Sequence, residues 1–183
     1  DRKPLPGKLA FSRDLFVLLF LLRGMPFVDL AFLRRCDLQG NVITYHRRKT
    51  SRKLTVVVGK EAMEIIQKYM YAIPDSPYLF PIIQNPGKDE YGQYARMLRL
   101  QNYRLTQVAN ILGIRDRLST YTARHTWATT ALRQNYNSSL ICDAMGHSSV
   151  KVTETYFQPY RDDEVNRMNS SLITYILSKK KMG

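Results

Sequence analysis

Cysteine is scarce in this chain, which has only Cys36 and Cys142 among 183 residues. Two cysteines cannot form a disulfide framework, so the chain is not a disulfide-stabilised secreted scaffold, and both thiols are expected to be reduced. Signal-peptide patterns, low-complexity segments and long hydrophobic runs are also missing. The apolar run at residues 15–22 has eight residues, whereas about 20 are needed to span a bilayer. We therefore interpret it as a buried helix and expect no membrane partner.

Acidic residues are few relative to basic ones. Lys and Arg number 28 against 15 Asp and Glu, which gives a formal net charge of +13. This excess indicates a polyanionic partner, since each nucleic-acid phosphate that a protein neutralises releases condensed counterions. Hydrophobic residues make up 44% of the chain, enough to bury one substantial core. We therefore expect one globular domain.

The spacing of apolar residues predicts a mainly α-helical fold with one small antiparallel β-sheet. Ser12 can cap the first helix, Pro26 can begin the second, and Gly113 is expected to end the longest. A basic hairpin tip joins two predicted strands, residues 42–46 and 54–58. The predicted helices cover residues 12–23, 27–35, 60–72, 90–112, 121–135, 139–145, 150–157 and 162–177, with a proline-rich connector at 74–86.

Three residue types near the end of the chain fit one chemistry. Arg124-His125 is followed by Gly146-His147 and, nine positions later, by Tyr156. A phosphodiester near its pentacoordinate transition state gathers negative charge on its non-bridging oxygens, which a guanidinium or an imidazole N–H can bind with directed donors. A tyrosine hydroxyl that attacks phosphorus keeps the bond energy in a phosphotyrosyl ester, so cleavage can be reversed without ATP. The pattern indicates phosphoryl transfer with Tyr156 as the nucleophile.

The residues around these positions resemble the tyrosine recombinase (phage integrase) family. Residues 121–129 are similar to the family box with the second catalytic arginine. Residues 145–149 and 153–156 are similar to the box with its histidine and nucleophile. The resemblance covers about residues 8–178. The sequences of residues 22–25 and 45–50 are similar to those of integrases carried by mobile elements of gut anaerobes.

The resemblance implies a tyrosine recombinase catalytic-domain fold and an enzyme that cleaves and rejoins DNA through a 3′-phosphotyrosyl intermediate, with no cofactor and no metal. Arg124 and His147 would bind the phosphate that Tyr156 attacks, and Tyr160 is the alternative nucleophile. Lys49, at the hairpin tip, would protonate the leaving 5′ oxygen. The remaining basic residues of the hairpin would contact DNA: Arg47, Arg48, Arg52 and Lys53. Lys53 is also the alternative to Lys49 as the general acid.

At the first catalytic arginine of the family this chain has Pro26, which carries no charge. We expect Arg23 to supply the missing guanidinium, or an arginine from elsewhere such as Arg96 or Arg99. If Arg23 is structural instead, it is expected to cap carbonyls or to pair with Asp29.

At the family's histidine, three positions before the second arginine, this chain has Tyr121. A neutral phenol with a pKa of about 10 can orient or donate but is a poor base at neutral pH. The neighbouring His125 is expected to pack and hydrogen-bond inside the core.

By the same resemblance, residues 1–183 are the catalytic domain of a longer protein, without its N-terminal DNA-binding domains. The partners would be double-stranded DNA and other recombinase subunits in a tetrameric synapse, in the cytoplasm and associated with the nucleoid. Two other functions stay open: a sequence-specific DNA-binding module with impaired catalysis, and a type IB-like topoisomerase. The last helix carries an apolar stripe expected to pack on its own domain or on a neighbouring subunit, formed by Val165, Met168, Leu172, Ile173 and Ile176.

Overall fold

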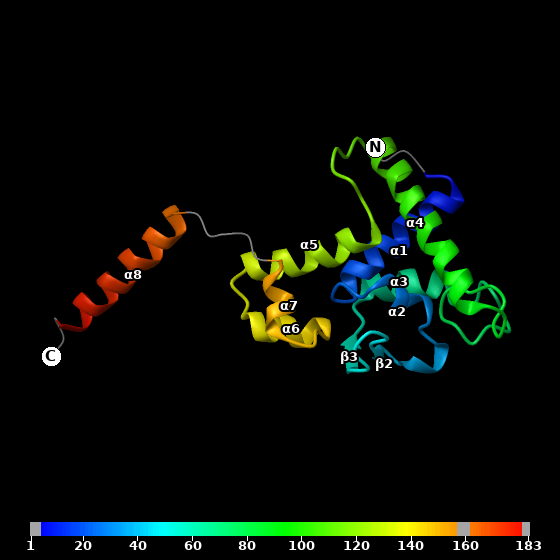
Figure 1. The fold of residues 1–183 in the computed structure, drawn as a ribbon, viewed down its shortest axis with the longest axis horizontal. Helices are drawn as coiled ribbons and strands as arrows, with labels where there is room; N and C mark the ends of the chain where they lie inside the picture. Colours follow the sequence, from blue (N-terminus) through cyan, green and yellow to red (C-terminus); the bar gives the residue numbers. More distant parts are fainter. Residues whose placement is uncertain (1–4, 157–161, 181–183) are drawn as a thin grey trace.

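The computed structural model of the chain describes residues 5–156 and 162–180. In these ranges it is mainly helical, as predicted, with a small antiparallel sheet below the helices in Figure 1. No helix in them is long and apolar enough to cross a membrane. The helices are α1 (Gly7–Leu21), α2 (Phe27–Ala31), α3 (Lys60–Tyr69), α4 (Glu90–Leu112), α5 (Thr120–Arg133), α6 (Ser138–Met145), α7 (Val150–Glu154) and α8 (Asp162–Lys180), with a 3-10 turn, η1 (Arg35–Asp37).

The sheet has the strand order β1-β2-β3, formed by β1 (Leu38–Gln39), β2 (Val42–His46) and β3 (Lys53–Val57). β2 pairs with β3 from Val42 opposite Val57 to His46 opposite Lys53. Successive side chains of a strand point to opposite faces, and Ile43 and Tyr45 are the buried ones of β2. The predicted hairpin is therefore confirmed to within one residue. Strand β1 was not predicted, because a strand of two residues is too short to show an alternation of apolar and polar residues.

Helix α1 lies in the middle of the domain, against α3, α4 and α5. Its residues Leu15, Leu18 and Leu19 have no exposed surface, and burying one leucine side chain contributes about 2 kcal/mol. A second, smaller core lies where α5, α6 and α7 meet, and its buried members are Ala128, Ile141, Met145 and Tyr156. The predicted nucleophile is thus part of an apolar cluster.

The predicted start of the first helix is wrong. α1 begins at Gly7, directly after Pro6, and Ser12 is fully buried within the helix instead of capping it. The carbonyl of Ser12 accepts a hydrogen bond of 2.8 Å from the side-chain amide of Gln101 on α4. A helix–helix contact therefore decides the environment of Ser12, and local capping preference does not.

The predicted end of the second helix is also wrong. α2 begins after Pro26 but ends at Ala31, not at residue 35. Beyond it the chain pairs with the connector, where the N–H of Leu79 donates to the carbonyl of Leu33 at 2.8 Å. These tertiary hydrogen bonds replace the helical ones that local propensity favours.

The later helices lie close to the predicted ranges. α4 coincides with residues 90–112 and ends at Gly113, which has a left-handed φ of 67°. Gly146 ends α6 in the same way, with a φ of 63°. α7 ends at Glu154, earlier than predicted, and residue 157 lies outside the described ranges.

Candidate active site

Helix α5 places Arg124 in the interior. Ser119 caps this helix by accepting a hydrogen bond from the N–H of Thr122, and the buried face of the helix carries Ala123, Arg124 and Ala128. Only 6% of Arg124 is exposed. Its guanidinium donates to the carbonyl of Gly24 at 2.6 Å and to the carbonyl of Met145 at 3.0 Å.

Gly24 is required at this contact. It has a φ of 66°, and a Cβ at this position would lie 3.1 Å from the Cα of Arg124. Left-handed backbone and close approach both favour glycine.

The two carbonyls that accept from Arg124 are neutral, and so is the Tyr156 phenol that bonds to its side chain, so none of these partners supplies a counter-charge. Burial and, after it, the nearby charge of Arg47 lower the pKa of Arg124, whereas the phenol of Tyr156 acts in the opposite direction. A buried cation without a compensating anion is costly. The surroundings of Arg124 therefore favour binding of an anion such as a phosphate.

His147 lies on the turn between α6 and α7 and is 5% exposed. Its Nδ1 lies 2.8 Å from the hydroxyl of Thr153. Burial, followed by the charges of Arg124, Arg47 and Lys49, lowers the pKa of His147 to about 4. The imidazole is therefore neutral at pH 7. When the Thr153 hydroxyl donates to Nδ1, the ring proton lies on Nε2, which can then donate to a phosphate oxygen.

Tyr156 lies among three other rings, and 5% of it is exposed. Its ring is parallel to that of His147, with centroids 5.9 Å apart and an interplanar angle of 5°. The hydroxyl of Tyr121 donates to the hydroxyl of Tyr156 at 3.1 Å. Burial and this hydrogen bond raise the pKa of Tyr121 to about 12, so Tyr121 keeps its proton at neutral pH. Tyr121 is thus placed to orient the nucleophile as a donor. Tyr160 lies outside the described residues.

His125 is not in the core, and the prediction that it packs there is wrong. It is exposed, with its ring edge-on to that of Tyr156 at a centroid distance of 5.4 Å. Ala123 and Arg124 already occupy the buried side of α5, so the next residue turns outward. The i, i+4 spacing from Tyr121 could have placed His125 on the same side of the helix.

The β2–β3 hairpin packs against the turn that carries His147. The hydroxyl of Thr50 donates to the carbonyl of Gly146 at 3.2 Å. The guanidinium of Arg52 donates to the carbonyl of His147 at 3.3 Å and pairs with Asp143 at 2.8 Å. Lys49 is exposed at the tip, and its charge is one of those that lower the pKa of His147. The charge of the predicted general acid thus acts on His147, one of the two predicted phosphate-binding residues.

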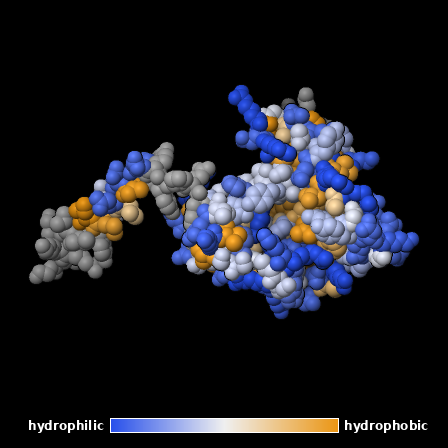
Figure 2. Space-filling view, in the orientation of Figure 1, coloured by the Kyte–Doolittle hydropathy of each residue, from blue (hydrophilic) through white to orange (hydrophobic). Residues whose placement is uncertain are grey.

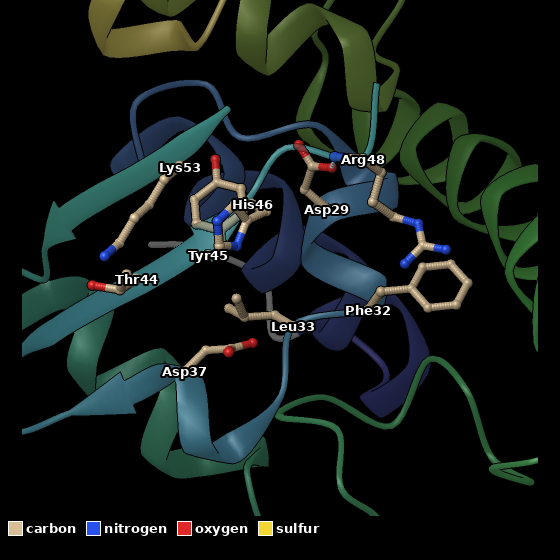
Figure 3. A pocket seen from close by; sticks show the side chains of 9 residues that line it. All are labelled: Asp29, Phe32, Leu33, Asp37, Thr44, Tyr45, His46, Arg48 and Lys53. Atoms are coloured by element: carbon tan, nitrogen blue, oxygen red, sulfur yellow. Dashed lines mark hydrogen bonds between the residues drawn. The ribbon is translucent and has the colours of Figure 1, made fainter. Parts of the chain in front are cut away.

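Other basic residues of the hairpin lie on a different side. Arg48 and Lys53 line a pocket of about 310 Å³ whose other lining residues include Asp29 and Tyr45 (Figure 3). The Arg48 guanidinium lies over the ring of Phe32, with its Cζ 3.8 Å from the ring centroid. Figure 3 shows Lys53 on the far side of the pocket from this pair. Arg48 and Lys53 are exposed, as a DNA-contacting role requires.

Arg47 differs from the other hairpin arginines. Only 6% of it is exposed, so it does not lie on a solvated basic turn. It forms an ion pair with Asp29, and its Nε lies 3.4 Å from a carboxylate oxygen. Asp29 is the residue that Arg23 was expected to pair with if Arg23 is structural. Arg47 is therefore not on the exposed face of the hairpin with Arg48 and Lys53.

Arg23 is not brought to Tyr156 by any contact in the described ranges. Its guanidinium donates to the carbonyl of Thr55 on β3 at 3.2 Å. Arg96 and Arg99, the other suggested replacements, are exposed on α4, where Arg96 lies 3.8 Å from Asp89. The described part of the chain has no group of three or more His, Cys, Asp or Glu residues that could hold a metal ion.

A model of the Phage integrase family matches residues 7–162. The chain belongs to the phage integrase family. Among its relatives, the tyrosine recombinase XerC of Thermodesulfovibrio yellowstonii is 26% identical over 167 residues, which cover 84% of this chain and 52% of that protein. The XerC of Syntrophus aciditrophicus is 24% identical over 165 residues, covering 84% and 51%. The phage integrase chain therefore spans about half the length of these curated relatives.

Solved structures show the same fold. A crystal structure of XerA recombinase has a TM-score of 0.61 at 18% identity and covers 93% of this chain and 64% of its own. The Tn1549 transposon integrase, in complex with a circular intermediate DNA, has a TM-score of 0.65 at 18% identity and covers 93% and 66%. The predicted fold of this phage integrase, mainly α with a small antiparallel sheet, is confirmed.

Proposed function

We propose that this chain is the catalytic domain of a site-specific DNA recombinase that cleaves and rejoins DNA strands through a 3′-phosphotyrosyl intermediate. One observation carries the proposal: the Tyr156 phenol lies against His147 and Tyr121 and next to the buried Arg124, whose guanidinium bonds to two neutral carbonyls and to the phenol itself. A nucleophile, a neutral donor and an unneutralised guanidinium are the groups that phosphoryl transfer requires. Membership of the phage integrase family supports the same reaction.

In the proposed reaction, the Tyr156 oxygen bonds to phosphorus as the bond from phosphorus to the 5′ oxygen breaks. Arg124 and His147 bind the non-bridging oxygens, where negative charge develops. Lys49 gives a proton to the 5′ oxygen, and the phenol proton leaves to solvent. Religation is the reverse, with the 5′ hydroxyl as the nucleophile.

The test is capture of the intermediate on a DNA substrate nicked next to its cleavage site, so that the strand beyond the cut diffuses away. We expect a covalent protein–DNA adduct, and mass spectrometry of the digested adduct should place the phosphate ester on the peptide that carries Tyr156. A stable complex with DNA that never becomes covalent would support the second candidate, an impaired DNA-binding module. Pro26 at the family's arginine position and Arg23 bonded to Thr55 are the observations that favour this candidate.

The role of Lys49 gives a separate prediction. Lys49→Ala should slow cleavage of ordinary DNA, because the 5′ alkoxide then leaves without a proton. A substrate with sulfur at the 5′ bridging position should restore much of the rate, since a thiolate leaves well unprotonated. Single-turnover cleavage of both substrates measures this. Lys53→Ala, on the same hairpin, is the matched control and should show no selective rescue. Equal losses on both substrates would make Lys49 a phosphate contact.

We further propose that the protein acts on double-stranded DNA as one subunit of a larger recombinase assembly. The apolar side chains of α8 support this, because Val165, Met168, Leu172 and Ile173 are between 46% and 59% exposed. Figure 2 shows apolar residues on this helix, which lies apart from the other helices in Figure 1. An exposed apolar stripe of this kind typically marks an interaction site. The side chain of Ile176 lies outside those described.

Truncation after Asp162 should therefore weaken assembly of several subunits on DNA more than binding of one subunit. Sedimentation of the protein with DNA that carries one or two binding sites separates the two steps. Unchanged assembly together with an unchanged Tm would show that α8 packs neither on a neighbouring subunit nor on its own domain. If relaxation of supercoiled plasmid needs no assembly, the topoisomerase alternative is favoured.

A further inference from the structure

A second buried guanidinium lies beside Arg124. Arg47 follows the last residue of β2, and 6% of it is exposed. Its Nε faces Asp29 at 3.4 Å, too far and too poorly directed for a hydrogen bond by the usual geometry. Neither Nε nor one of its terminal nitrogens, Nη1, has a hydrogen-bond partner among the described residues, although both are buried. Native proteins rarely leave such donors unpaired without a reason.

The side chain of Arg47 runs beneath the turn that carries His147. A Cβ added to Gly146 would come within 2.9 Å of the Cγ of Arg47, so the glycine is needed for this approach. The charge of Arg47 lowers the pKa of both Arg124 and His147. Arg47 therefore shares the electrostatic environment of the two residues already assigned to the phosphate.

The buried charges in this region do not balance. Arg47 and Arg124 contribute two guanidiniums, and Asp29 is the carboxylate that pairs with Arg47. Burial raises the pKa of Asp29, with the Arg48 backbone and then Arg47 acting against this rise. The other oxygen of Asp29 accepts the N–H of Arg48 at 3.0 Å, and the charge of Arg124 also lowers the pKa of Asp29, so this one carboxylate lies near both guanidiniums. The two guanidiniums therefore outnumber the carboxylate, and one further anion would neutralise the excess positive charge. A phosphodiester supplies a single negative charge.

We propose that Arg47 is the second phosphate-binding guanidinium of this site, in the role left open by Pro26. The inference rests on the proposed function. In it, Arg124 and Arg47 bind the phosphate from two sides, and the unpaired nitrogens of Arg47 become its donors. Asp29 holds Arg47 in place and is a positioning residue. Arg23, bonded to the carbonyl of Thr55, does not take this part.

The experiment compares variants of the full chain on a nicked substrate that carries the cleavage site. Arg47→Ala should lower the single-turnover cleavage rate roughly 100- to 1,000-fold, the range seen when one transition-state donor is removed. Arg23→Ala, which removes a guanidinium bonded to the carbonyl of Thr55, and Arg133→Ala, at the exposed end of α5, are the controls and should leave the rate nearly unchanged. A substrate with a neutral methylphosphonate at the scissile position lacks one charged non-bridging oxygen, so its transition state needs less positive charge from the protein for stabilisation. On it, the deficit of Arg47→Ala relative to wild type should shrink.

Removal of Arg47 also leaves Asp29 without its ion pair, so the fold must be controlled separately. The double variant Asp29→Asn with Arg47→Met removes both charges and keeps the volume, a replacement that proteins often tolerate. We expect it to melt near the wild-type Tm and still to cleave slowly. If Arg47 only neutralised Asp29, the double variant would regain the wild-type rate, and the inference would be overturned.

The two proposals fail in different ways. A wild-type chain that forms no covalent adduct overturns the proposed function and this inference with it. A wild-type adduct combined with full cleavage by the folded double variant overturns only the role of Arg47. A strong loss in Arg23→Ala, with Arg47→Ala near wild type, would return the second guanidinium to Arg23.

Discussion

Tyr156→Phe should abolish the covalent protein–DNA adduct and leave DNA affinity almost unchanged. The substitution removes one oxygen and no charge, and it keeps a ring that is 5% exposed between His147 and its neighbours. It also removes the acceptor of the Tyr121 hydroxyl, which costs little because Tyr121 is 58% exposed and can donate to water instead. Gel separation of the denatured adduct and a binding titration on intact DNA measure the two effects.

Tyr121→Phe is the matched control, since it breaks the same 3.1 Å hydrogen bond from the other side and keeps the nucleophile. It should slow adduct formation without preventing it. An adduct formed by Tyr156→Phe would place the nucleophile elsewhere, and peptide mapping would show whether it is Tyr160. Such a result would leave the family and fold untouched and change only the residue that attacks.

Local signals predicted much of this fold because they act within one element. Helix α4 matches the predicted range, since a cap at Asp89 and a left-handed Gly113 mark its two ends. The β2–β3 hairpin was likewise predictable, because β-branched residues lie on both sides of a basic turn. The order of Arg124, His147 and Tyr156 could be read from the sequence, and the structure places all three within one buried region.

The wrong or missing predictions depend on contacts between distant parts of the chain. Ser12 is buried because α4 covers it, and α2 stops because the connector pairs with the residues after it. Arg47 looks like any other residue of a basic run until the turn at Gly146 covers it. Burial of a charged residue within such a run leaves no local pattern. Proximity in the sequence to Pro26 therefore favoured Arg23 as the missing guanidinium over the more distant Arg47.

Arg124→Ala should slow cleavage about 1,000-fold or more, because the charge that develops on the phosphate loses a buried, positively charged donor. The same change leaves the carbonyls of Gly24 and Met145 without their donor. Unpaired buried acceptors cost about 1–3 kcal/mol each, so some loss of stability is also expected. Rates must therefore be divided by the folded fraction, which circular dichroism melting provides.

Two further variants separate charge from fold. Arg124→Lys keeps the positive charge but cannot reproduce a planar guanidinium that bridges two carbonyls and a phosphate, so we expect partial activity only. Arg133→Ala, at the exposed end of the same helix, removes an arginine from α5 without touching the site and should cleave normally. If folded Arg124→Ala cleaves within about tenfold of wild type, Arg124 is a structural bridge between α5, Gly24 and Met145, and the phosphate must be held by other donors.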